Sequence, residues 1–101
     1  MYKRQIPFPA RLISPGSNDQ VNLDNGRFTF QWEGRDLDND IISFDFYLGE
    51  DIDDLKLINS GLTNSTFETE LEAGKNYYWK IITKDSKENT SSSLGSFSTS
   101  T

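Results

Sequence analysis

Three carboxylates at alternate positions come closest to a metal site in this sequence. Asp36, Asp38 and Asp40 lie in one polar segment, and carboxylate oxygens that converge in a loop are ligands for Ca²⁺. The EF-hand pattern, however, needs Gly where Ile41 stands and Glu where Tyr47 stands. The segment therefore has two interpretations, a partial calcium loop or a polar turn whose carboxylates are solvated.

The sequence lacks the side chains that most often carry out acid–base or nucleophilic chemistry. It contains no cysteine, and so no disulfide, thiolate nucleophile or zinc–sulfur site. It contains no histidine, the side chain that titrates nearest to neutral pH. Carboxylates can replace histidine in an enzyme, but we find no cleft-forming sequence around them. We therefore expect a protein that is not an enzyme and has no cofactor, calcium excepted.

The charge balance narrows the range of partners. The formal net charge is −6, and an acidic surface repels both phosphate backbones and anionic lipids, so we expect no nucleic-acid binding and no membrane insertion. No apolar run approaches the length of a membrane span. Residues 1–10, MYKRQIPFPA, lack the apolar core of a signal peptide. We expect a monomer.

The strongest structural signal is a period of two that begins at Tyr77. A strand directs successive side chains to opposite faces, so this period predicts a half-buried strand. One face carries two lysines and should meet solvent. The predicted buried set is Tyr77, Trp79, Ile81 and Thr83, and the predicted solvent set is Tyr78, Lys80, Ile82 and Lys84. We expect the other strands to pack around this one.

Similar alternation, with turn residues between the segments, predicts an all-β domain. The seven expected strands span residues 10–14, 27–32, 41–48, 55–58, 66–71, 77–84 and 94–99. The inward residues of the second and third strands are Phe28, Phe30, Trp32, Ile42, Phe44, Phe46 and Leu48. This spacing is typical of a seven-stranded antiparallel immunoglobulin-like sandwich, here over residues 9–101, after a linker or tail at residues 1–8.

Three local features refine this expectation. Residues 17–26 should form a loop, from which Val21 tucks under the sandwich, and residues 59–65 should form another. Leu94 and Phe97 have opposite parity, so a bulge near Gly95 is expected if both are buried.

Two tyrosines on the solvent face are the candidate binding residues. If Phe46 lies opposite Trp79 in neighbouring antiparallel strands, then Tyr47 faces Tyr78. Two exposed rings could stack on a sugar or on a partner protein. The alternative, which we favour, is a cross-strand pair that stabilises the sheet by roughly 0.2–1 kcal/mol, because single surface aromatics are common.

The same topology places the loops after residues 32 and 84 at one end of the domain. Asp85 and Glu88 are therefore the candidate helpers of a calcium loop at Asp36 to Asp40. A second acidic run, 50–54, should lie at the opposite end. There it is expected to be a solvated face that discourages edge-to-edge pairing.

A short corner precedes the strand that begins at Tyr77. Gly74 can adopt a positive φ, and the order Leu71, Gly74, Tyr77 resembles the corner of the fibronectin type III family, with Ala73 where that family often has proline. In sandwiches of this kind a tyrosine near the start of strand F bonds back to the upstream backbone. Tyr77 takes this place.

The resemblance extends over about residues 9–99. Trp32 closes the second strand, Phe44 lies in the third, and Phe97 and Thr99 end the last. The segments DLDNDIISFDFYLGE and NYYWKIITKD are most similar to the bacterial branch of the fibronectin type III family. That branch occurs in cell-surface and secreted multidomain proteins, often beside carbohydrate-active or surface-binding domains.

The resemblance implies a non-catalytic module that spaces or presents other domains of a larger extracellular protein. Its partners would be the neighbouring domains and, in addition, a polysaccharide or a surface protein. The alternative is a binding module that uses the Tyr47 and Tyr78 face for a carbohydrate or protein, or the Asp36, Asp38 and Asp40 loop for calcium. Fold alone does not choose between them.

Calorimetry with Ca²⁺ tests the metal hypothesis. Because the EF-hand pattern fails at two positions, we expect no heat of binding and no shift in melting temperature when Ca²⁺ is added. A saturable heat together with a higher melting temperature would instead establish the calcium loop, and Asp38→Asn should then abolish both.

Overall fold

The structure is a computed structural model that describes residues 8–16, 18–35, 41–86 and 89–100. Within these residues it consists of β-strands and connecting turns, without a helix of any length, and so without one that could cross a membrane. The strands are β1 (Phe8–Ser14), β2 (Asp19–Val21), β3 (Arg27–Arg35), β4 (Ile41–Gly49), β5 (Lys56–Leu62), β6 (Thr66–Glu70), β7 (Asn76–Asp85) and β8 (Thr90–Thr99).

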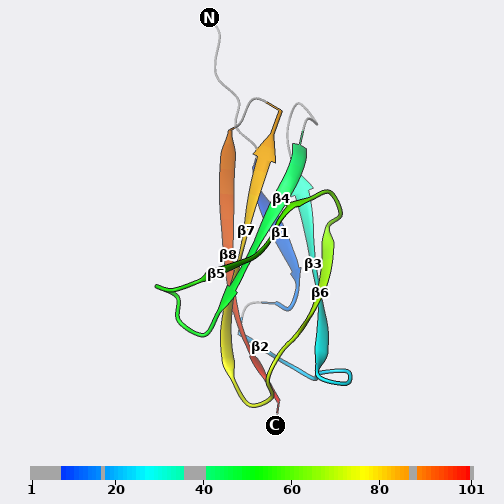
Figure 1. Cartoon of the computed structure of the whole chain (residues 1–101), viewed down its shortest axis with the longest axis vertical. Helices are drawn as coiled ribbons and strands as arrows, with labels where there is room; N and C mark the ends of the chain where they lie inside the picture. Colours follow the sequence, from blue (N-terminus) through cyan, green and yellow to red (C-terminus); the bar gives the residue numbers. More distant parts are fainter. Residues whose placement is uncertain (1–7, 17, 36–40, 87–88, 101) are drawn as a thin grey trace, which may run out of the picture.

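The strands form two sheets that pack face to face (Figure 1). One sheet has the order β1-β3-β6, and the other has the order β2-β8-β7-β4-β5. The predicted all-β immunoglobulin-like sandwich is confirmed. The predicted number of strands is wrong, because the described residues form eight strands and not seven.

The additional strand is β2, which lies inside the predicted loop at 17–26. It pairs parallel to the end of β8, with Val21 opposite Thr99, and the amide of Asn18 donates to the carbonyl of Ser96 at 2.8 Å. Val21 is buried, as predicted. Three residues are too few to show a period of two, and the strand is held by backbone bonds to β8, so its residue types carry little signal.

Several strands are longer than their patterns indicate. β1 begins at Phe8, inside the predicted linker at 1–8, and β3 continues past Trp32 to Arg35. β5 continues to Leu62 through the predicted loop at 59–65, and β8 begins at Thr90 and not at Leu94. Most of β5 is exposed on both faces, so burial imposes no alternation on it. The register of β8 with β7 is continuous, and Leu94 is 49% exposed, so the condition for a bulge near Gly95 is not met.

Aromatic rings from both sheets fill the core. Phe30 of β3 lies 4.8 Å from Phe46 and 5.0 Å from Trp79, measured between ring centroids. The predicted inward set of β7, namely Tyr77, Trp79, Ile81 and Thr83, is buried throughout. Phe30, Trp32, Phe44, Phe46 and Leu48 are buried as well. The side chain of Ile42 lies outside the described residues, and Ile41, beside an irregularity in the β4–β7 register, packs against the core.

Asp45 of β4 is an exception to the predicted alternation. It belongs to the outward set, yet it is only 6% exposed. Its carboxylate accepts the amide of Gly61 at 3.1 Å and pairs with Lys84 Nζ at 3.3 Å. The carboxylate therefore fastens the edge strand β5 to β4, which is why a charged side chain is buried here.

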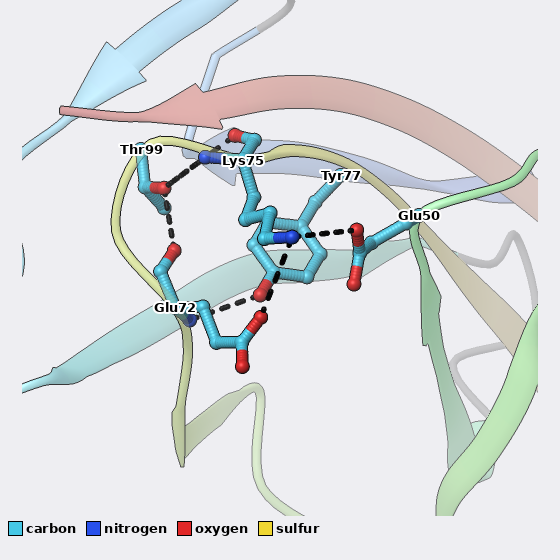
Figure 2. A network of polar contacts seen from close by, with 5 residues as sticks. All are labelled: Glu50, Glu72, Lys75, Tyr77 and Thr99. Carbon is cyan, nitrogen blue, oxygen red and sulfur yellow. Dashed lines mark hydrogen bonds and ion pairs between the residues drawn. The ribbon is translucent and has the colours of Figure 1, made fainter. Parts of the chain in front are cut away.

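The corner before β7 has the geometry that the sequence predicts. Leu71 is buried, and Gly74 has a φ of 72°. The amide of Glu72 donates to the hydroxyl of Tyr77 at 2.9 Å (Figure 2), and the Tyr77 ring stacks on Phe97 with 5.5 Å between centroids. The bond from Tyr77 back to the upstream backbone is confirmed.

The end of β8 is tied into the same corner. Thr99 Oγ1 donates to the carbonyl of Glu72 at 2.6 Å and accepts the amide of Lys75 at 2.9 Å (Figure 2). The amide of Gly74 donates to the carbonyl of Thr99 at 3.1 Å. Lys75 Nζ also lies 3.8 Å from Glu50 and from Glu72, but these pairs are exposed and contribute little. The neutral bonds therefore join the corner to the C-terminal strand.

Replacing Tyr77 by Phe tests the corner. The ring and its packing on Phe97 remain, but the amide of Glu72 loses its acceptor, so we expect a loss of about 1 kcal/mol in the free energy of unfolding. Urea denaturation followed by tryptophan fluorescence measures it.

Tyr78→Phe is the matched control. It removes the same hydroxyl from the next residue, where the described residues provide no hydrogen-bond partner, so its effect should stay within about 0.5 kcal/mol. Equal losses in the two variants would show that the corner bond does not stabilise the fold.

Candidate functional site

The predicted calcium ligands Asp36, Asp38 and Asp40, together with the helper Glu88, lie outside the described residues. Asp85 is described, and it is 2% exposed. Its carboxylate accepts the backbone amide of Asn89 at 2.9 Å and the side-chain amide at 3.3 Å. Asp85 therefore closes the turn between β7 and β8. Among the described residues, no three Asp or Glu side chains gather as metal ligands would.

The second acidic run is solvated. Glu50, Asp51, Asp53 and Asp54 are all exposed. Asp51 Oδ1 accepts the amide of Asp53 at 3.0 Å, and Asp54 pairs with Lys56 at 3.2 Å across two exposed side chains. These contacts shape a turn between β4 and β5 and leave the carboxylates in water.

The predicted pairing of Tyr47 with Tyr78 is wrong. In the β4–β7 register Tyr47 lies opposite Lys80, Tyr78 lies opposite Gly49, and Phe46 lies opposite Ile81. The error is a slip of two residues, which leaves every side chain on its predicted face and changes only its cross-strand partner. The two rings are therefore diagonal neighbours on the outer face of the sheet.

Tyr47 is engaged by its true partner. Lys80 Nζ lies 4.7 Å from the centroid of the Tyr47 ring, a distance at which the ammonium is attracted by the ring face. Both residues are half-buried. The contact joins β4 to β7 on the outer face of the sheet, and the role of Tyr47 in binding stays a prediction.

Tyr78 lies instead at a depression that the sequence does not reveal. The depression has a volume of about 250 Å³ and is lined by Asn18, Asn76, Tyr77, Tyr78, Ser96, Phe97 and Ser98. Tyr78 pairs with Ser96, and Asn76 pairs with Ser98, across β7 and β8. The only signal in the sequence is the alternate serines of β8. Asn18 comes from a distant segment, and only the fold brings it here.

The lining determines what this site can do. Asn and Ser side chains donate and accept hydrogen bonds without carrying charge, and Tyr adds an apolar ring with a polar tip. No carboxylate, lysine or arginine is among the described lining residues. The described lining of the depression can therefore exchange hydrogen bonds with a neutral polar group.

Comparisons with known proteins identify the fold. No family model matches the sequence, and no curated protein matches it. The structure is similar to the fibronectin(III)-like modules of CbhA from Clostridium thermocellum, with a TM-score of 0.73 and 19% sequence identity over 96% of this chain. It is also similar to part of a β-1,2-glucanase from Parabacteroides distasonis, with a TM-score of 0.58 and 18% identity over 95% of this chain.

These similarities establish a fibronectin type III-like fold. At 19% and 18% sequence identity they show the fold alone. The chain spans about half of the first protein, 48%, and 14% of the second. The same fold therefore occurs as one part of longer chains.

Nuclear Overhauser contacts test the corrected register. We expect contacts between the Tyr47 ring and the side-chain methylenes of Lys80, because the two residues are directly paired. Strong contacts between the rings of Tyr47 and Tyr78, without any between Tyr47 and Lys80, would contradict this register and favour the one predicted from the sequence. Tyr78 would then pair with Tyr47 and would not lie at the depression.

Proposed function

We propose that this chain is a non-catalytic module that spaces or presents other domains of a larger protein at the cell surface or outside the cell. The observation that carries the proposal is the fold itself, which recurs as a fraction of longer chains in both similar structures. A fold does not fix a function, so the features of this chain that suit the role are set out next.

The shape of the domain suits a spacer. In Figure 1, where the longest axis is vertical, β1 begins in the upper half of the view and β8 ends at the bottom. A chain that enters and leaves at opposite ends separates its neighbours by the length of the domain. The corner bonds to Thr99 hold the exit strand in place, so a neighbour attached beyond β8 would keep its orientation.

One of the similar structures suggests what the neighbouring domains do. One similar chain is a β-1,2-glucanase, and we propose that this module likewise accompanies a domain that acts on, or binds, a polysaccharide outside the cell. An acidic surface with a net charge of −6 supports solubility and discourages association between copies. The module would therefore act as a monomer beside its covalently linked neighbours.

A domain exchange in the protein that carries this chain tests the spacer role. Replacing residues 9–99 with a Gly/Ser linker of equal residue count should leave turnover of a soluble oligosaccharide unchanged, and should lower activity on the insoluble polymer several-fold. A flexible linker cannot hold a fixed separation, whereas an unrelated rigid sandwich of similar length should restore the activity.

An activity assay on the isolated chain of 101 residues tests whether the module is non-catalytic. The chain should release no reducing ends from β-glucans. Hydrolysis by the isolated chain would contradict the non-catalytic role, and full activity with the Gly/Ser linker would contradict the spacer role.

A further inference from the structure

We propose that the depression beside Tyr78 binds one ring of a neutral sugar. The site consists of Asn18, Asn76, Tyr78, Ser96 and Ser98, and we call it the Tyr78 depression. This inference goes beyond the spacer role and does not depend on it, because it rests on the outer face of the β7–β8 pair and on Asn18 beside it.

The register places these side chains on one surface. In β7 the odd-numbered residues from Tyr77 to Thr83 are buried in the core, so Asn76 and Tyr78 point outward. In β8 Phe97 and Thr99 are buried, so their neighbours in sequence, Ser96 and Ser98, point outward too. Direct pairing across the strands, Asn76 with Ser98 and Tyr78 with Ser96, brings these four side chains together.

Asn18 completes the site from the other side of β8, and its position is fixed. It adopts a φ of 62°, in the left-handed region that asparagine accepts more readily than most residues other than glycine. Its amide donates to the carbonyl of Ser96 at 2.8 Å, and its side-chain oxygen accepts the Ser96 hydroxyl at 3.1 Å. The bound oxygen turns the side-chain NH₂ of Asn18 away from Ser96.

The remaining polar groups of the site are open to solvent. Within the part of the chain that the structure describes, no hydrogen bond is made by the side chains of Asn76, Tyr78 or Ser98, or by the NH₂ of Asn18. Together they offer donors and acceptors without net charge. A carbohydrate presents hydroxyls at its edge and C–H groups on its face, which match these amides and hydroxyls and the Tyr78 ring. A charged ligand would find no counter-ion in the described lining.

Tyr78 is better placed than Tyr47 to meet a sugar. The ring of Tyr47 already carries Lys80 Nζ at 4.7 Å, whereas Tyr78 is half-buried between Gly49 and Ser96, two small neighbours. The space over Gly49 is taken by the backbone of Asp54 and by Leu55, whereas on the β8 side Tyr78 lines the depression together with Ser96 and Ser98. At about 250 Å³ the depression is smaller than the roughly 300–1,000 Å³ of sites that enclose drug-sized ligands, which suits a single ring of a longer polymer.

Titration of the ¹⁵N-labelled chain followed by NMR tests the proposal. The probes are cellopentaose, laminaripentaose and maltopentaose as neutral oligomers, and tetragalacturonate as an acidic one, each up to about 5 mM because a one-ring site binds weakly. At least one neutral oligomer should shift the amide signals of Asn18, Asn76, Tyr78, Ser96 and Ser98 in a saturable manner. Tetragalacturonate should not.

Variants identify the site. Tyr78→Ala should weaken binding roughly tenfold or more, and Tyr47→Ala, on the same face of the sheet, is the matched control that should bind as the unmodified chain does. Asn18→Gly removes the amide without straining the backbone, because glycine accepts a positive φ, and it should also weaken binding. A dispersed NMR spectrum confirms that each variant is folded.

The proposal is overturned if none of the neutral oligomers produces a saturable shift. It is also overturned if the shifts fall on residues away from the depression, or if Tyr47→Ala weakens binding as much as Tyr78→Ala does. Binding of tetragalacturonate with equal affinity would show that the site does not select neutral sugars.

Discussion

The corner from Leu71 to Tyr77 is the constraint that joins the two sheets and the last strand, and the hydrogen bond from the amide of Glu72 to the hydroxyl of Tyr77 closes it. This bond fixes the corner at the point where the chain crosses from β6 of one sheet to β7 of the other. The same ring stacks on Phe97 of β8, and Thr99 two residues later bonds to both sides of the corner. The Tyr77 hydroxyl and the Thr99 hydroxyl therefore hold the start of β7 and the end of β8 at one corner.

In this arrangement the inner face of the five-stranded sheet forms the core, and the outer face is open to solvent. The inner face of β7 and β8 supplies Tyr77, Trp79, Ile81 and Phe97 to an aromatic core, which a domain of this size needs in order to bury enough apolar surface. The outer face does not need to bury apolar surface in the core. It holds the Lys80–Tyr47 contact and the Tyr78 depression, so the pairing that secures the core also fixes where an outward-facing site can form.

The sequence predicts the elements in which burial imposes a pattern. The period of β7 and the corner from Leu71 to Tyr77 are read correctly because one face is buried and Gly74 marks the turn. β5 is missed in part because both of its faces meet solvent, and β2 because three residues show no period. The slip between β4 and β7 is invisible to patterning, since a shift of two residues leaves the same side chains inside. The depression requires Asn18 to meet Ser96 across 78 positions of sequence, which no local pattern reports.

Native-state hydrogen exchange measures most directly whether the corner closes the fold. The amides of Glu72, Lys75 and Thr99 are each bonded within the corner. If the corner is part of the cooperative structure, these amides should exchange only through global unfolding, with the same free energy of opening as the central amides of β7 and the same dependence on denaturant. Fast exchange of the three amides through a local opening, while β7 stays protected, would contradict the account.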